Sequence, residues 1–311
     1  MIKFLTNRLL QFVPTVLGVV TLTFFFIHMV PGDPLEALLG EDALAADRAA
    51  LAAKLGLDKP ILEQYSHYLI NVFQGDLGTS LYSGRPVTNL ILERLPATAE
   101  LAFAALFFAI LLVFPMGVFA AQRRKQWPDK VTMAGSLLGF SMPNFWLGPL
   151  LIMFFSLWLG WLPVSGRDDG MWSLILPAIT LGTGMAAVLS RLVRASLLEV
   201  LDADYIRTAR AKGVGKKSLI WHHAMRNALL PVVTVLFLQA GTLLTGAILT
   251  EAVFSWPGLG TLMIDALNQR DYAVVQGGVL FIAMVYLSMT LLADIMYAFI
   301  DPRIKFGKGA A

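Results

Sequence analysis

The stretch LAFAALFFAILLVFPMGVFAA, residues 101–121, contains no charged residue and is followed by the basic run Arg123, Arg124 and Lys125. An α-helix needs about 20 apolar residues to cross the hydrocarbon layer of a bilayer. This stretch is therefore long enough to cross a membrane once. The basic run after it is typical of a cytoplasmic helix end.

The composition of the whole chain points the same way. Of its 311 residues, 57% are hydrophobic and only 14% are charged, whereas soluble domains usually carry about 25% charged residues. The sequence therefore predicts an all-α, polytopic membrane protein with six transmembrane helices. Besides 101–121, the apolar stretches that give these spans are 9–30, 131–164, 171–190, 228–250 and 272–293.

The stretch 131–164 is too long for one simple crossing and contains Pro143. Proline removes a backbone hydrogen bond and bends a helix. Two separate crossings would each be too short, so we predict one long, kinked helix here.

Basic residues orient the bundle, because short cytoplasmic loops are enriched in lysine and arginine. With the N-terminus inside, most of the 24 lysines and arginines fall in segments expected on the cytoplasmic side: the N-terminal end, 122–130, 191–227 and the C-terminal tail. An odd number of spans would put 191–226 and the tail on opposite sides. The pattern therefore predicts two cytoplasmic termini, and it favours a membrane over nucleic acid as the partner of the basic residues.

The predicted outer loop, 31–97, has structure of its own. It contains an alanine- and leucine-rich helix at 41–56, a second helix around 61–72, a turn-rich stretch at 75–80 and an amphipathic piece at 89–95. A loop this long is usually functional, so we expect a docking or gating role, the alternative being a cap that steadies the bundle. The predicted domains are 1–30, 31–97 and 98–311, the last containing the cytoplasmic segment 191–227.

In that cytoplasmic segment, basic residues outnumber acidic ones. Residues 205–212 are predicted to form a short helix that ends at Gly213 and Gly215, and 216–228 to form a basic amphipathic helix. On composition alone, the segment is a positive face that binds anionic lipid headgroups.

The sequence DYIRTARAKG at 204–213, followed by HAMRNALLP at 223–231, resembles the cytoplasmic signature of peptide-type binding-protein-dependent ABC permeases. In that family the segment is a coupling helix, which fits into a groove on an ATPase subunit and transmits closure of the ATPase dimer. The resemblance implies this role for Tyr205, Arg207, Thr208, Ala209, Arg210, Ala211, Lys212 and Gly213.

Motifs along the rest of the chain resemble, in the same order, the B-type subunit of dipeptide and oligopeptide importers. The Glu-Ala-Ala opening of the wider superfamily is replaced by Arg207-Thr208-Ala209, and its Leu-Pro ending falls late, at Leu230-Pro231. This departure resembles the peptide branch more than sugar or amino-acid importers. The other matching motifs are PGDP (31–34), LGLD (55–58), GDLG (75–78), RLP (94–96), EAVF (251–254), PGLG (257–260), RDY (270–272) and DPR (301–303).

The chain contains no G-x-x-x-x-G-K-[ST] phosphate loop, so we expect it to bind no cofactor itself. The resemblance implies two ATP-binding subunits that hydrolyse ATP with magnesium. It also implies a second, homologous permease subunit in a heterodimer, an external substrate-binding protein and a place in the bacterial inner membrane. The chain would then form half of the translocation pathway for di- or oligopeptides.

Ionisable residues at membrane depth are costly and are therefore candidate sites. Glu251 opens the EAVF motif and, with Phe254, is a candidate for an outer gate. Ser141 and Asn144 are candidates for the pathway, or else they satisfy carbonyls freed at the kink. The small residues of the fourth span, Gly182, Gly184 and Ala186, are predicted to serve close helix packing.

Several other functions find no support in the sequence. The absence of cysteine excludes disulfides, thiolate metal sites and cysteine catalysis. The four histidines lack the spacing of metal ligands, and no nucleophile–base pair marks an enzyme site. Open alternatives are a permease for nickel chelates, glutathione or another small solute, and a self-sufficient secondary transporter. A secondary transporter would be expected to contain inverted repeats, and none is evident.

Overall fold

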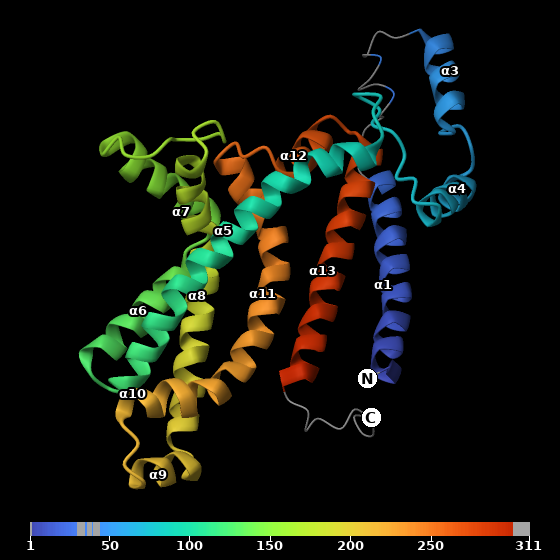
Figure 1. Cartoon of the computed structure of the whole chain (residues 1–311). Coiled ribbons are helices and arrows are strands. Elements are labelled where there is room, and N and C mark those ends of the chain that lie inside the picture. The colour runs from blue at the N-terminus through green and yellow to red at the C-terminus, as the bar shows by residue number, and fades with distance from the viewer. Residues whose placement is uncertain (1, 30–34, 36–38, 40–43, 301–311) are drawn as a thin grey trace. The chain divides into compact units, whose positions relative to one another are not determined.

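A computed structural model describes the chain except for residues 1, 30–34, 36–38, 40–43 and 301–311 (Figure 1). The described residues form helices joined by turns, and their only β-pairing is an isolated bridge between Thr79 and Pro86. The all-α prediction is confirmed. The motifs at 31–34 and 301–303 lie outside the described residues.

Among the described residues, five helices are long and apolar enough to cross a membrane, and a bent pair makes six if it counts as one span. Each overlaps a predicted apolar stretch, so the multi-span prediction is confirmed. The five are α1 (Ile2–Met29), α5 (Val87–Gln122), α8 (Met171–Leu201), α11 (Met225–Val253) with the turns before it, and α13 (Tyr272–Ile300).

The prediction of a single kinked helix at 131–164 is wrong, because the structure has a bent pair of helices there. Helix α6 (Trp127–Ser141) is followed by α7 (Asn144–Leu151) and the π-helical turn η1 (Ile152–Trp158), across a bend of 105°. Met142 and Pro143 between them are extended, with ψ of 115° and 142°. The proline ring disfavours helical backbone in the preceding residue, so the helix breaks completely rather than kinking.

The chain divides into two compact units. The first comprises Met1–Thr98 and Pro257–Leu287, and the second comprises Ala99–Trp256 and Ser288–Ala311.

In the second unit, α8 packs against α6, α7 and α11. A Cβ atom built on Gly182 would lie 2.6 Å from the carbonyl oxygen of Ala105 on α5, whereas one on Gly184 would meet nothing within 4 Å. Gly182 therefore serves the close packing predicted for it, and Gly184 does not. The hydroxyl groups of Ser136 on α6 and Ser190 on α8 are hydrogen-bonded at 2.9 Å.

In the first unit, helices form where the sequence predicts them in the loop after α1. They are α3 (Ala45–Leu55) and α4 (Ile61–Phe73). The hydroxyl groups of Thr21 on α1 and Tyr65 on α4 are hydrogen-bonded at 2.6 Å. The ring of Phe24 packs against those of Tyr65 and Tyr68. Helix α4 is thus attached to α1 by aromatic packing and a hydrogen bond.

Asp271, at the start of α13, fixes the loop that precedes α5. Its carboxylate, 2% exposed, accepts hydrogen bonds from the Ser80 hydroxyl at 2.5 Å and the Leu81 amide at 3.2 Å. Helix α12 (Leu259–Asn268), the start of α13 and the first turns of α5 enclose a hydrophobic core. The amphipathic piece at 89–95 belongs to α5, which begins at Val87.

Candidate functional site

The segment predicted to couple the chain to an ATPase leaves the second unit as a short excursion between α8 and α11. Helix α9 (Asp204–Ala211) follows α8, and α10 (Lys216–Ser218) and the π-helical turn η2 (Leu219–Ala224) lead into α11. Figure 1 shows α9 beyond the end of α8. Helix α9 contacts α8 and η2.

One buried side chain anchors α9. Ile206 is fully buried, and the carboxamide of Asn227 on α11 donates a hydrogen bond of 2.8 Å to the hydroxyl of Tyr205. The eight predicted coupling residues are brought together on this helix and its end, and only Ala209 is half-buried. The exposed ones are Tyr205, Arg207, Thr208, Arg210, Ala211, Lys212 and Gly213.

Gly213 ends α9 because its backbone adopts φ of 83°, a left-handed conformation that glycine reaches without the steric cost of a Cβ. Its amide donates to the carbonyl of Arg210 at 3.0 Å, and the amide of Val214 donates to that of Ala209 at 3.2 Å. A Cβ on Gly213 would meet nothing within 4 Å. The requirement for glycine is therefore conformational, not steric crowding by neighbours.

An ion pair that the sequence did not predict joins α6 to α8. The carboxylate of Asp129, 4% exposed, accepts from Arg194 at 2.5 Å (Nε) and 2.8 Å (Nη2) and from the amide of Lys125 at 2.8 Å. Nearer to α9, an exposed pair joins Arg124 and Asp202 at 3.5 Å. The turn between α5 and α6 is thus tied to the end of α8 from which α9 departs. The available signal for this ion pair in the sequence was the position of Asp129, the acidic residue nearest the basic run at 123–125.

The candidate gate residues are buried at the end of α11. Glu251 is 0% and Phe254 is 1% exposed. A Cβ on Gly148 of α7 would lie 3.2 Å from the Phe254 ring, so α7 and α11 pack closely there. The candidate pathway residues lie elsewhere on these elements: Ser141 is exposed at the end of α6, and Asn144 is half-buried at the start of α7.

A loop between η1 and α8 closes over this end of α11. The amide of Gly166 donates to the carbonyl of Phe254 at 2.8 Å. Arg167 forms an ion pair with Glu100 on α5, and its guanidinium lies 5.8 Å from the ring centre of the fully buried Trp256. Sequence reasoning did not select Arg167 or Trp256, because their relationship depends on tertiary contacts.

These features are those of a helical protein with several candidate membrane spans and a short exposed helix between two of them. The chain belongs to the family of binding-protein-dependent transport system inner membrane components: the model of that component matches residues 113–306, and the model of its N-terminal region matches residues 1–102. The chain is therefore a multi-pass component of an inner-membrane transport system and acts with other components of that system.

Curated relatives match over nearly their whole length. The dipeptide transport system permease protein DppB of Escherichia coli K12 is 46% identical, over 99% of this chain and 100% of the relative. The glutathione transport system permease protein GsiC of Pectobacterium atrosepticum is 45% identical, over 98% and 100%. The di/tripeptide transport system permease protein DppB of Pseudomonas aeruginosa is 45% identical, over 98% and 99%.

Solved structures share the fold at lower identity. An inward-facing MetNI methionine ABC transporter matches with a TM-score of 0.57 and 21% identity, over 68% of this chain and 96% of the other. An amino acid ABC transporter matches with a TM-score of 0.51 and 18% identity, over 70% and 95%. At these identities the likeness shows the fold of the chain alone.

Proposed function

We propose that the chain forms half of the translocation pathway of an ATP-driven importer for di- or oligopeptides, with ATP and magnesium bound by separate subunits. The observation that carries this proposal is α9, a short helix whose exposed residues face away from a single buried anchor, Ile206. The family assignment and the two permeases named for dipeptides and di/tripeptides support the cargo class.

The geometry suggests how motion would pass through α9. A groove on an ATPase subunit would hold the exposed residues, of which Arg207, Arg210 and Lys212 carry positive charge. The buried Ile206 and the Tyr205–Asn227 hydrogen bond make the helix move together with α8 and α11. Displacement of α9 would therefore tilt both of these helices. Such tilting is the alternating access that the importer needs.

Six further features belong to the proposal. The partner permease is a homologous chain in a heterodimer. Two ATP-binding subunits bind the permeases, one of them at α9, and an external binding protein delivers cargo. Both termini are cytoplasmic, as the basic segments favour. Glu251 and Phe254 form part of an outer gate, supported by their complete burial where α7 meets α11. Ser141 and Asn144 line the pathway at the break between α6 and α7.

Glutathione is the second candidate cargo. The observation that favours it is the 45% identity to a glutathione permease over 98% of this chain. Competition for uptake separates the two. If dipeptides are the cargo, unlabelled dipeptide will suppress uptake of a labelled dipeptide, and glutathione at the same concentration will not.

Affinity purification of the tagged chain from its own membranes in mild detergent tests the proposal. We expect mass spectrometry to identify a second multi-span permease and chains that carry the ATP-binding phosphate loop. Recovery of this chain alone, with uptake activity after reconstitution without ATP, would instead establish a secondary transporter.

A further inference from the structure

The first unit contains a cavity of about 410 Å³ between α1, α4, the turn that precedes α4 and the start of α13. This volume lies within the range of about 300–1,000 Å³ that is usual for small-molecule sites. None of the coupling, gate or pathway residues named above lines it. The cavity therefore has no role in the function proposed so far.

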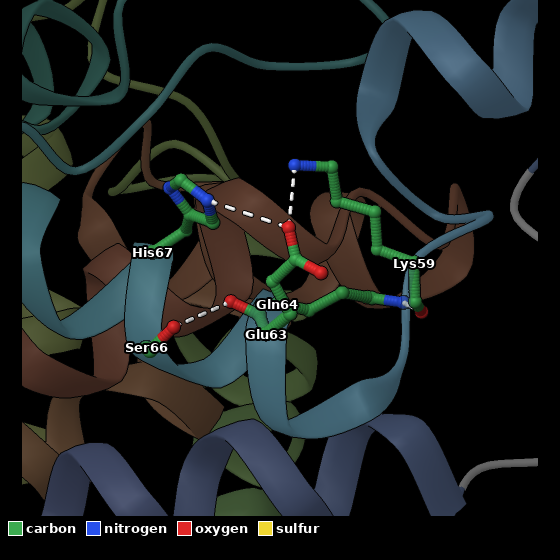
Figure 2. A network of polar contacts seen from close by, with 5 residues as sticks. All are labelled: Lys59, Glu63, Gln64, Ser66 and His67. Carbon is green, nitrogen blue, oxygen red and sulfur yellow. Dashed lines mark hydrogen bonds and ion pairs between the residues drawn. The ribbon is translucent and has the colours of Figure 1, made fainter.

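Polar contacts hold one wall in place, and Figure 2 shows the residues around Glu63 and Gln64 that take part in them. The carboxamide of Gln64 donates to the carbonyl of Lys59 at 2.8 Å and to that of Leu57 at 3.4 Å. These two acceptors orient the carboxamide, whose oxygen lies 3.3 Å from Nε2 of His28. Nδ1 of His28 lies 2.7 Å from the carbonyl of Phe24. The turn before α4, α4 itself and α1 are thus linked, so this wall is preorganised for a ligand.

Among its described residues, the rim of the cavity contains one cationic side chain, that of Lys59. Lys59 and His67 line the cavity, and both approach the carboxylate of Glu63, at 2.8 Å and 3.9 Å. The hydrogen bond and charge of Lys59 hold the pKa of Glu63 below its usual value, so this carboxylate is ionised at neutral pH. The Lys59 ammonium has three donors, and Glu63 accepts from one. No carboxylate is among the described residues that line the cavity.

Two polar groups of the wall lack hydrogen-bond partners in the described part of the chain. The carboxamide of Gln276 on α13 forms no hydrogen bond there, although this residue is only 8% exposed. The hydroxyl of Tyr68 is buried without a partner, and burial raises the pKa of Tyr68 to about 12. Buried polar groups are nearly always hydrogen-bonded. A ligand in the cavity would supply the missing partners.

We propose that this cavity is a binding site for a short peptide on the permease itself, in which Gln276 pairs with the peptide backbone and Lys59 with the terminal carboxylate. The choice of a peptide rests on the proposed function. The existence of the site rests on the cavity and on the unpaired groups in its wall.

The chemistry of the lining matches a peptide at each point. A carboxamide offers an N–H donor and a C=O acceptor, the same pair that a peptide group offers, and Gln276 and Asn71 both line the cavity. The rings of Phe24 and Tyr272 can take an apolar side chain. Since no carboxylate is found among the described lining residues, they do not repel the terminal carboxylate of a peptide.

Equilibrium binding of radiolabelled alanyl-phenylalanine to the purified full chain in lipid nanodiscs, without ATP or binding protein, tests this site. We expect Gln276→Leu and Tyr68→Phe each to weaken binding by about tenfold, because each removes one hydrogen-bonding group. The matched controls are Gln269→Leu and Tyr82→Phe, which make the same changes at exposed positions outside the cavity. They should bind as the wild type does. Free phenylalanine, which lacks the peptide group, should compete poorly.

A second measurement covers the case in which a variant fails to fold. The chain has no cysteine, so Asn71→Cys gives a single thiol at the cavity, and dipeptide should slow its alkylation by a maleimide. Unchanged affinity in folded Gln276→Leu, or alkylation that dipeptide does not slow, would overturn the site. A chain that binds dipeptide here but imports nothing would contradict only the proposed function. Import that is normal in Gln276→Leu and Tyr68→Phe, with unchanged binding, would contradict only the site.

Discussion

At the scale of single residues, Gly213 is the position at which sequence and structure agree most closely. The sequence predicts a helix end there, and the structure places it at φ of 83°. A residue with a Cβ pays roughly 1–2 kcal/mol in this conformation. The sequence did not reveal the single anchor at Ile206, because burial on a short helix depends on what lies beneath it.

Gly213→Val should reduce ATP-dependent uptake by about tenfold or more, because the strain displaces the end of α9 from its partner. The protein should remain in the membrane at normal abundance. Uptake into proteoliposomes that contain the whole transporter measures this effect. Gly215→Ala is the matched control, because Gly215 has φ of −62° and open space around it. Normal uptake by Gly213→Val would refute the coupling role of the α9 end.

Asp129→Ala should destabilise the second unit by about 3 kcal/mol, because it leaves the partly buried Arg194 without its carboxylate. Thermal unfolding of the purified protein in detergent measures this change. Arg124→Ala removes an exposed ion pair and should change the unfolding free energy by less than about 1 kcal/mol. Equal effects of the two substitutions would show that burial does not decide the strength of these pairs.

At the scale of the elements, the apolar stretches predict the spans because a crossing helix has a minimum length that the sequence displays directly. The sequence predicted a kink at Pro143, whereas the helix breaks completely at Met142–Pro143. Pro143 is visible in the sequence, but the angle between α6 and α7 depends on how α7 packs against α8 and α11. The Arg194–Asp129 pair was missed for a similar reason, since it joins residues 65 positions apart.

Gly182→Ala should destabilise the chain by about 1–3 kcal/mol through overpacking against α5, since the added methyl group would lie 2.6 Å from a backbone oxygen. Gly184→Ala, on the same helix, should be neutral or stabilising by up to about 1 kcal/mol, because alanine favours the helical state. The difference in unfolding temperature between the two variants, measured in one detergent, tests the packing. The same loss in both would contradict it.

At the scale of the whole molecule, the orientation in the membrane follows from the basic residues and not from the structure. Because the chain has no cysteine, single cysteines report sidedness without background. An impermeant maleimide should label Ser66→Cys on α4 in intact cells. Lys212→Cys, at the end of α9, should react only after permeabilisation. The reverse pattern would invert the proposed topology.

The partners and the cargo are also properties of the whole assembly. The order of motifs along the chain predicted the family, because a match in many separated segments in the same order is more specific than a match in any one of them. The cavity in the first unit was not predicted, since its lining comes from α1, α4 and α13 and only the fold brings these together.

The most direct test of the central claim, that α9 couples this chain to a separate ATPase, is photo-crosslinking from α9 in native membranes. A benzophenone amino acid at Ala211, which is exposed on α9, should give an adduct with a chain that carries the ATP-binding phosphate loop. The same group at Phe107 on α5, 70% exposed within a span, should not. Adducts with lipid alone from position 211 would contradict the coupling role and favour a membrane-surface role for the basic segment.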